Sequence, residues 1–354
     1  MKTSTDLDGS IRAAIAERLE RLITIDVSAR GVIDVLYDAG RKEQSGPLLD
    51  FAASLLLPRL RAGATVFILT GYPTKTWFTP GLTECDGPVG AASLGRMLNL
   101  ACGVIPVFMI ESRLSRFMVA AARAAGFIVA PEGATLGRET RPAPVRATSV
   151  LPFPVEIDEA EREAARLLGV ADPAAIVAIE MPGVGRNGSF HTSTGLGVPS
   201  EYVPRFEVLL RAAAERGVPS VGIADGGAEI GMGRIEHAIR ERVPYGAKCK
   251  CPCGDGMASH VATDALVLAT ISNWGGHALG MLIAALVGRT DVLHDGPLEL
   301  EMVRACVHEG AVDGMAPGVG LSVDGLDVTG NAAMVDLLRR TVMSALERMP
   351  RKQS

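Results

Sequence analysis

Two carboxylates in a glycine-rich stretch are the first residues of this sequence that point to chemistry. Residues 221–233 read VGIADGGAEIGMG, and place Asp225 and Glu229 among five glycines directly after an apolar run. Glycine costs backbone entropy and packs nothing, so such a cluster suits either a tight strand-to-helix turn or a close approach of the backbone to a ligand. If a helix begins near Gly227, its free N–H groups can hold an anion, while Asp225 holds a cation or an amine.

Three more polar stretches follow apolar runs in the same way. They are TGYPTKTWFTPGLTECDGP, IEMPGVGRNGSFH and ATISNWGGHALG. Their candidate residues are Lys75, Glu84, Asp86, Glu180, Arg186, Asn187, His191, Ser272, Asn273, Trp274 and His277. An arginine such as Arg186 can hold a carboxylate through two parallel hydrogen bonds, and an exposed loop is the alternative for it. Taken alone, Asp86 before Gly-Pro is favoured as a helix cap, Trp274 as a packing residue and His277 as a capping or surface histidine.

A cysteine cluster forms a separate candidate. The segment CKCPCGDGMASH brings Cys249, Cys251 and Cys253 close to Asp255 and His260. One residue between cysteines is not the two-residue spacing of common zinc knuckles. An incidental loop is therefore the favoured interpretation, with a structural zinc site and a reactive thiol as alternatives. Soft thiolates also make this segment a poor catalytic centre for a hard cation.

Short β-branched runs alternate with longer amphipathic segments, and this alternation predicts a doubly wound, Rossmann-like, mostly parallel α/β sheet. In such sheets, ligands bind outside the carboxyl ends of the strands, where the polar stretches fall. The expected strands are Thr65–Thr70, Val104–Ile110, Phe127–Ala130, Ile176–Ile179, Ser220–Ala224 and Ala265–Ile271. The expected helices include Gly46–Leu60, Val89–Ala101, Ile157–Leu168, Ser200–Glu215, Glu229–Arg242, Gly276–Val287 and Asn331–Arg348.

Proline-rich residues 131–156 are the best candidate for an extended connection between two halves. We therefore expect two interlocked α/β lobes, residues 1–140 and 141–354, with a cleft at the strand ends; one continuous domain is the alternative. The length of 354 residues suits either arrangement.

Composition excludes several function classes. Apolar residues make up 48% of the chain, the formal net charge is -5 and there is no basic run, so we expect no nucleic-acid partner. The apolar stretches are too short to cross a bilayer, and the acid-containing N-terminal segment differs from a signal or transit peptide, so a cytoplasmic protein is the expectation. Neither a GxGxxG motif nor a P-loop is present, so we expect no nucleotide cofactor.

Taken in order, five motifs resemble the D-glutamate cyclase family. They read TGYP…TECDGPVGA, EMPGVGRNGSFH, GIADGGAEIGMG, ISNWGGHAL and GAVDGMAPGVGLSVDGLD, and the resemblance spans roughly residues 20 to 345. It implies condensation of the α-amine of D-glutamate with its γ-carboxyl, giving 5-oxo-D-proline and water. The chain departs from the family pattern at Ala224, at Ala228 and in the CKCPC segment.

The resemblance also implies site residues. As catalytic groups it indicates Glu84, Asp86, Asp225 and Glu229, and as substrate-binding groups Arg186, Asn187, Gly226, Gly227, Ser272, Asn273 and Trp274. Further matching positions are Gly87, Glu180, Gly188, Asp313, Gly314, Asp324 and Gly325. Lactam closure needs a carboxylate that accepts a proton from the amine, and an acid or cation on the oxygen that leaves.

Several acids converging from different strand ends repel one another unless a cation or a shared proton offsets them. This motivates a divalent metal, magnesium or manganese, on Glu84, Asp86 and Asp225. The alternatives to the cyclase are a hydrolase of a small lactam or cyclic amide, and a non-catalytic amino-acid-binding protein. The expected partner is a small amino-acid substrate, and a homo-oligomer is compatible with the sequence.

Overall fold

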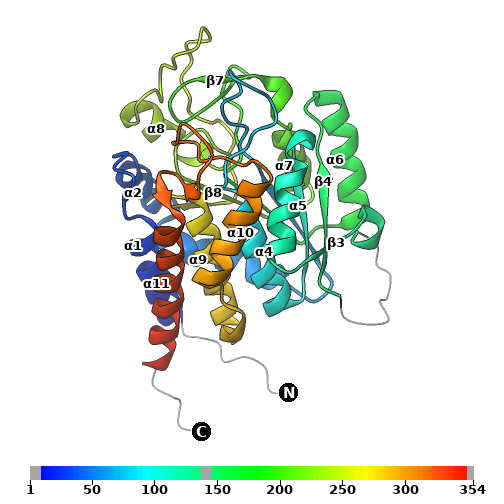
Figure 1. Ribbon diagram of the computed structural model, residues 1–354, viewed down its shortest axis with the longest axis vertical. Helices are drawn as coiled ribbons and strands as arrows, with labels where there is room; N and C mark the ends of the chain where they lie inside the picture. The colour runs from blue at the N-terminus through cyan, green and yellow to red at the C-terminus, as the bar shows by residue number, and fades with distance from the viewer. Residues whose placement is uncertain (1–8, 137–144, 349–354) are drawn as a thin grey trace.

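A parallel sheet forms the centre of the computed structural model, which describes residues 9–136 and 145–348. Its seven strands lie in the order β3-β4-β2-β1-β5-β8-β9, and helices cover both faces (Figure 1). The strands are β1 (Thr65–Thr70), β2 (Ile105–Ile110), β3 (Ile128–Val129), β4 (Ala147–Pro152), β5 (Ala175–Ile179), β8 (Ser220–Ala224) and β9 (Ala265–Leu268). All pair in parallel, which confirms the predicted doubly wound α/β class.

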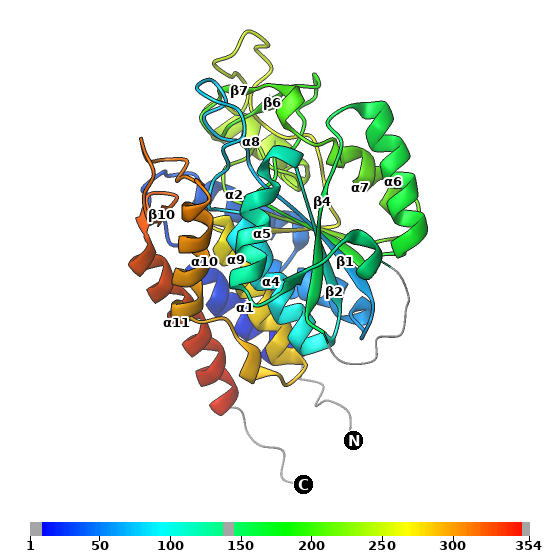
Figure 2. The ribbon, with the colours of Figure 1, turned by 45° about the vertical axis from the view of Figure 1, so that its right-hand side comes forward.

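The helices fall into two layers, one on each side of the sheet (Figure 2). The larger layer contains α1 (Gly9–Ile23), α3 (Leu48–Leu56), α4 (Pro88–Cys102), α5 (Ser115–Ala124), α9 (Ser272–Leu286), α10 (Gly296–His308) and α11 (Val328–Glu347). The other layer has α6 (Ile157–Ala171) and α7 (Phe206–Ala214), with α2 (Ile33–Gln44) and α8 (Glu236–Arg242) against the end of the sheet at β9. Two short hairpins, β6 (Phe190–His191) with β7 (Gly197–Val198) and β10 (Ser322–Val323) with β11 (Leu326–Asp327), lie outside the sheet.

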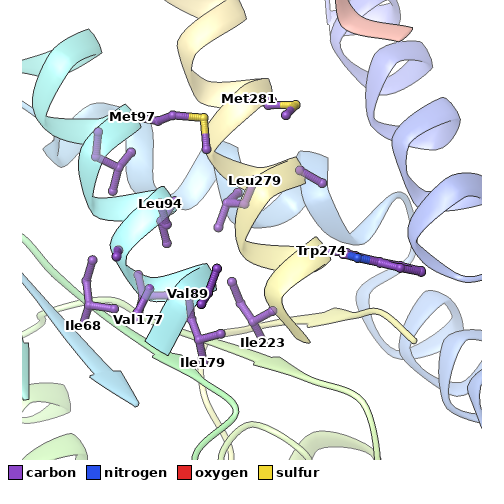
Figure 3. Close-up of a cluster of buried hydrophobic side chains, with 14 of the residues drawn as sticks. Ile68, Val89, Leu94, Met97, Val177, Ile179, Ile223, Trp274, Leu279 and Met281 are labelled. Atoms are coloured by element: carbon purple, nitrogen blue, oxygen red, sulfur yellow. The ribbon is translucent and has the colours of Figure 1, made fainter. Parts of the chain in front are cut away.

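Strand β1 is buried on both faces, as its unbroken apolar sequence predicts. Val66 and Ile68 face the larger helical layer, whereas Phe67 and Leu69 face α6 and α7. Side chains of β1, β5 and β8 meet those of α4 and α9, which pack side by side above the sheet (Figure 3). The apolar core therefore fixes the strand ends from which the candidate residues extend.

The direction of the chain changes at β1. The chain passes from β1 to β2 on one side, and it later returns to pair β5 with the other side of β1. In open α/β sheets, a ligand crevice forms at such a switch point, outside the carboxyl ends of the strands. The ends of β1 and β5 are therefore where a site is expected.

Three predictions need correction. The proposed connection at 131–156 contains strand β4, which lies between β2 and β3 in the sheet; its residues 137–144 are outside the described part of the chain. The predicted helix at Glu229–Arg242 begins only at Glu236, after a turn and one 3₁₀ segment. His277, expected at a cap or on the surface, is fully buried.

The sheet takes strands from both sides of residue 140. The division into lobes of residues 1–140 and 141–354 stays a prediction. Across the described residues, no helix combines the length and the apolar character needed to cross a membrane.

A buried polar cluster ties three segments of the larger helical layer together. The Nε2 atom of His294 lies 2.8 Å from the Glu299 carboxylate, and Nε2 of His277 lies 3.2 Å from the same oxygen. Ser93 on α4 contacts Nδ1 of His277 at 2.7 Å. Burial alone would raise the pKa of Glu299, but the two histidines outweigh it and lower the pKa below its usual value.

We expect Glu299→Gln to lower the free energy of unfolding by about 3 kcal/mol at pH 7, because it leaves two buried imidazoles without their charged partner. Urea unfolding measures this change. Since folding lowers the pKa of Glu299, its contribution is present above pH 4.5 and is lost as the pH falls. The matched change Glu301→Gln, on an exposed position of the same helix, should have little effect. Equal stability of the two variants would contradict this role for Glu299.

Candidate active site

A cavity of about 440 Å³ opens at the carboxyl ends of β1, β5 and β8. Its charged lining residues are Arg30, Lys75, Glu84, Glu180, Asp225, Glu229 and Asp324. A larger cavity of about 650 Å³ lies between α1 and α11, but it is lined by arginines and apolar residues and contains none of the candidate residues. The chemistry that the sequence indicates is therefore concentrated at the switch point of the sheet.

Two of the acids directly follow strands. Glu180 comes after β5 with a φ of +44°, a region that non-glycine residues rarely adopt, and its Oε2 accepts a 2.6 Å hydrogen bond from the Ser272 hydroxyl. Asp225 comes after β8, and Nη2 of Arg30 donates to its Oδ2 at 2.5 Å. Lys75 and Asp324, which also line the cavity, share the positive φ. Such strain concentrates at sites where side chains must be aimed at a ligand.

Glu229 occupies the glycine-rich turn itself. The backbone N–H groups of Gly226 and Gly227 donate to its Oε2 at 3.3 and 2.8 Å. The predicted anion-binding turn is present, but its N–H groups hold this side chain, and no helix begins at Gly227. The glycines thus fix a carboxylate at the cavity wall.

Glu84 lies against Gly314, and any side chain at position 314 would force Glu84 to move. A Cβ atom on Gly314 would stand 2.4 Å from Cδ of Glu84. The GAVDGMAPGVGLSVDGLD motif, residues 310–327, therefore places its backbone directly against the Glu84 carboxylate. Asp313 holds the same loop in place, because its carboxylate accepts bonds from Ser322 Oγ and from the N–H groups of Met315 and Gly325.

Asp86 lies behind the cavity and bonds to the start of α9. Its carboxylate accepts hydrogen bonds from the N–H groups of Ser272 and Asn273 at 2.8 and 2.7 Å. Asn273 in turn accepts bonds from the N–H groups of Gly87 and Gly90 at 2.9 and 2.6 Å. Asp86 and Asn273 thus satisfy the N–H groups of each other's helices, so Asp86 caps α9 and not, as its place before Gly-Pro predicted, the helix that follows it.

None of the seven predicted substrate-binding residues is among those that line the cavity, and three of them have other contacts. Arg186 is more than half exposed and pairs with Glu236. Asn187 accepts a bond from the N–H of Ser189, and Trp274 is buried, with its ring N–H bonded to Asn331. Their substrate contacts are not part of this geometry.

Arg30 is the charged residue that sequence reasoning missed. Arg30 lies between α1 and α2, in a segment that follows no predicted strand. Its guanidinium forms an ion pair with Asp225 and lies 3.6 Å from Asp324. Burial lowers its pKa, but the charges of Asp225 and Asp324 outweigh burial and raise it. The packing of α1 against α9 and of α2 beside β9 brings Arg30 to the site, so no local sequence pattern predicts this position.

The acids of the site hold their protons unusually tightly. Burial, followed by the charge of Asp225, raises the pKa of Glu84 and of Glu229 to about 7. The same two causes raise the pKa of Asp86, Glu180 and Asp324 well above their usual values. Such perturbation in a cavity is typical of catalytic or metal-binding groups.

Three carboxylates are close enough to share one cation. Asp86, Glu180 and Asp225 each offer an oxygen within 4.8 Å of the other two, and all are buried. The sequence-based ligand set had Glu84 where this group has Glu180. Because burial and mutual repulsion raise the pKa values of Asp86 and Glu180, a cation between these oxygens would remove an electrostatic cost, and oxygen donors suit a hard divalent ion.

We expect Glu84→Gln to stabilise the metal-free protein at pH 8 by about 3 kcal/mol, since the pKa of Glu84 rises from 4.5 to about 7 and one pKa unit corresponds to about 1.4 kcal/mol. A folded-state pKa raised from 4.5 to about 7 means that the ionised carboxylate costs stability as the pH rises through this window. At pH 5 both side chains are neutral in the folded protein, so the difference should be small. Urea unfolding in EDTA at both pH values measures it.

The matched control is Glu215→Gln, at an exposed position outside the cavity. It should show no pH-dependent gain in stability. A Glu84→Gln variant that is less stable than the parent at pH 8 would contradict the raised pKa of Glu84.

Comparison with known proteins identifies the family. The model of the family "D-glutamate cyclase-like, C-terminal" matches residues 19–339. The human protein named D-glutamate cyclase, mitochondrial, is 28% identical over 275 residues, which cover 76% of this chain and 38% of the human one. This chain thus matches well under half of the length of that relative. Because the family match spans most of the chain and includes every lining acid, the chain belongs to the D-glutamate cyclase-like C-terminal family.

Proposed function

We propose that this chain is an enzyme that closes D-glutamate, or a close analogue, to 5-oxo-D-proline and water. The observation that carries the proposal is the cavity in which two carboxyl groups with pKa values of about 7 face two cationic side chains. Groups that titrate near neutral pH are the effective general acids and bases there. The family supports the reaction, and the name of the human relative supports the substrate.

Lys75 is the group that binds the α-carboxylate in this proposal. Among the described residues, its ammonium donates to the carbonyls of Asp313 and Gly314, at 3.2 and 3.1 Å, so it has donor capacity left for a substrate. Arg30 is already paired with Asp225 and Asp324, and its Nε is buried without a hydrogen-bond partner among the described residues. Arg30 therefore acts chiefly by offsetting the acids.

Glu229 is the general base, and Glu84 the general acid. The two N–H bonds to Glu229 favour its ionised form, which accepts a proton from the substrate ammonium. Glu84 has the charges of Asp225 and Asp313 beside it, which favour its protonated form. The free amine attacks the γ-carboxyl carbon and a C–N bond forms. The nitrogen then passes its second surplus proton to one oxygen of the former carboxylate, Glu84 gives the same oxygen its proton, the C–O bond breaks and water leaves. Transfer of the proton held by Glu229 to Glu84 restores both groups.

Asp86, Glu180 and Asp225 would hold a divalent cation, magnesium or manganese, in this proposal. When bound, such an ion would supply positive charge near the γ-carboxyl oxygens. Ser272 keeps Glu180 oriented through its hydroxyl, and the α9 N–H groups do the same for Asp86.

The cyclase explains two features that a binding protein does not need. A receptor for glutamate needs donors for two carboxylates and acceptors for one ammonium, whereas this cavity contains a surplus of buried acids with raised pKa values. A lactam hydrolase uses the same bond in reverse, and concentrations set the direction. The cytoplasmic location and the small amino-acid partner belong to the same proposal, and so does any homo-oligomer.

The deciding experiment incubates the full chain with D-glutamate, L-glutamate and 5-oxoproline, with magnesium, manganese or EDTA, and follows each compound by chiral chromatography. We expect D-glutamate to be converted to 5-oxo-D-proline, with loss of rate in EDTA. Asp225→Asn should lower the rate about 100-fold, which also excludes a contaminating enzyme. Saturable glutamate binding without turnover at any metal would contradict the cyclase and favour a binding protein.

We expect Lys75→Met to raise KM for glutamate about tenfold, because one charge-assisted contact to the α-carboxylate is lost. The value of kcat should change less, since Lys75 takes part in no proton transfer. Steady-state kinetics measure both. Lys248→Met, at an exposed lysine outside the cavity, is the matched control. An unchanged KM would place the α-carboxylate on other residues.

A further inference from the structure

We propose that His191, Cys249, Cys251 and Cys253 form a zinc site that fixes one wall of the cavity. Their ligand atoms all lie within 4.8 Å of one another, and they come from two segments far apart in the sequence. The proposal stands on this geometry alone and does not depend on the cyclase reaction. The sequence did not favour this site, because the cysteine spacing differs from that of common zinc knuckles and the fourth ligand, His191, lies far away in the sequence on β6.

The four atoms cluster around one point. The sulfur of Cys251 lies 3.3 Å from that of Cys249 and 3.2 Å from that of Cys253, and the Cys249–Cys253 separation is 3.3 Å. Nε2 of His191 lies 3.3 and 3.2 Å from the sulfurs of Cys251 and Cys253. In a tetrahedral site with Zn–S bonds of about 2.3 Å, sulfurs stand about 3.8 Å apart. The sulfur–sulfur distances would therefore grow by about half an ångström when the ion binds.

This packing does not fit the other uses of three cysteines. A disulfide brings two sulfurs to about 2.05 Å, and none of these pairs is bonded. An iron–sulfur cluster spreads its cysteines around several metal and sulfide atoms, so its ligand sulfurs stand much farther apart than these. Three thiolates and one imidazole in mutual contact are a ligand set of structural zinc.

Hydrogen bonds to the sulfurs support a thiolate centre. The backbone N–H of Gly256 donates to Cys249, and the backbone N–H of Asp255 donates to Cys253. The Asn187 side chain also bonds to Cys253, which gives this residue a place near the metal ligands instead of the substrate cavity. Such outer contacts orient ligands and offset the negative charge that three thiolates bring.

The site is closed and therefore structural. Four protein ligands complete a tetrahedron and leave no position for substrate. The two other nearby candidates are otherwise engaged: His260 pairs with Glu236, and Asp255 pairs with Arg240.

The zinc site lies directly behind the cavity. The turn between β6 and β7 contributes Thr192, Ser193 and Thr194 to the lining, and His191 begins this turn. The backbone N–H of Lys250, between two of the cysteines, donates to the carbonyl of Gly195 at 2.8 Å. The hydroxyl of Tyr72, which lines the cavity, donates to the carbonyl of His191. An ion on His191 thus holds the wall of the cavity against the 249–253 loop.

The test measures metal in the full chain purified without chelator. We expect close to one zinc per chain by mass spectrometry of the elements, and at least about tenfold weaker zinc retention in Cys253→Ser and His191→Gln. Cys102→Ser and His260→Gln, which alter a cysteine and a histidine outside the cluster, should retain zinc like the parent. Less than about one tenth of a zinc per chain after incubation with zinc, or iron in its place, would overturn the proposal.

A second measurement remains valid if a variant fails to fold. Cobalt substituted into the parent protein should show the near-ultraviolet thiolate charge-transfer band and the intense visible bands of a tetrahedral ion. Absence of both from a cobalt-loaded protein would mean that the metal lies on the carboxylates, which would overturn the cysteine site. Removal of zinc should lower the melting temperature, and zinc but not magnesium should restore it.

Discussion

The carboxylate of Asp86 is the constraint on which the site depends. It binds the first N–H groups of α9, while Asn273 at the start of α9 binds N–H groups at the start of α4. This exchange requires very close helices, and a Cβ atom on Gly90 would stand 2.7 Å from Cα of Asn273. Both helices begin behind the cavity, so their mutual capping fixes the position of Asp86, and the Ser272 hydroxyl orients Glu180 at the cavity wall.

The second constraint is electrostatic. Five acids with raised pKa values surround Asp225, and the cations within this group, Arg30 and Lys75, do not balance them. A folded protein accepts such a cost where function requires it, since apolar residues at these positions would be more stable. Protons or a divalent cation must offset the surplus charge. Either solution places mobile positive charge beside any bound carboxylate, as lactam closure requires.

The sequence predicted features that depend on local residue patterns, and it missed contacts between residues that are far apart in the chain. Strands β1, β5 and β8 stand out as apolar runs, so Glu180 and Asp225 after two of them could be assigned to the site. Strand β4 was not predicted, because it lies in a proline-rich segment and because its position between β2 and β3 depends on tertiary contacts. Arg30 joins Asp225 across the fold, and nothing in its neighbours signals this contact. The same limit applies to His191, whose cysteine partners lie in another loop.

The two metal sites that we propose differ in donor chemistry. Carboxylate oxygens at the end of the sheet suit a hard cation that exchanges water and substrate, whereas thiolates and an imidazole suit zinc held permanently. Tyr72 connects the two: it lines the cavity and bonds to the carbonyl of His191. In this proposal, zinc would fix the turn after His191, and a divalent cation would offset the charge of the carboxylates.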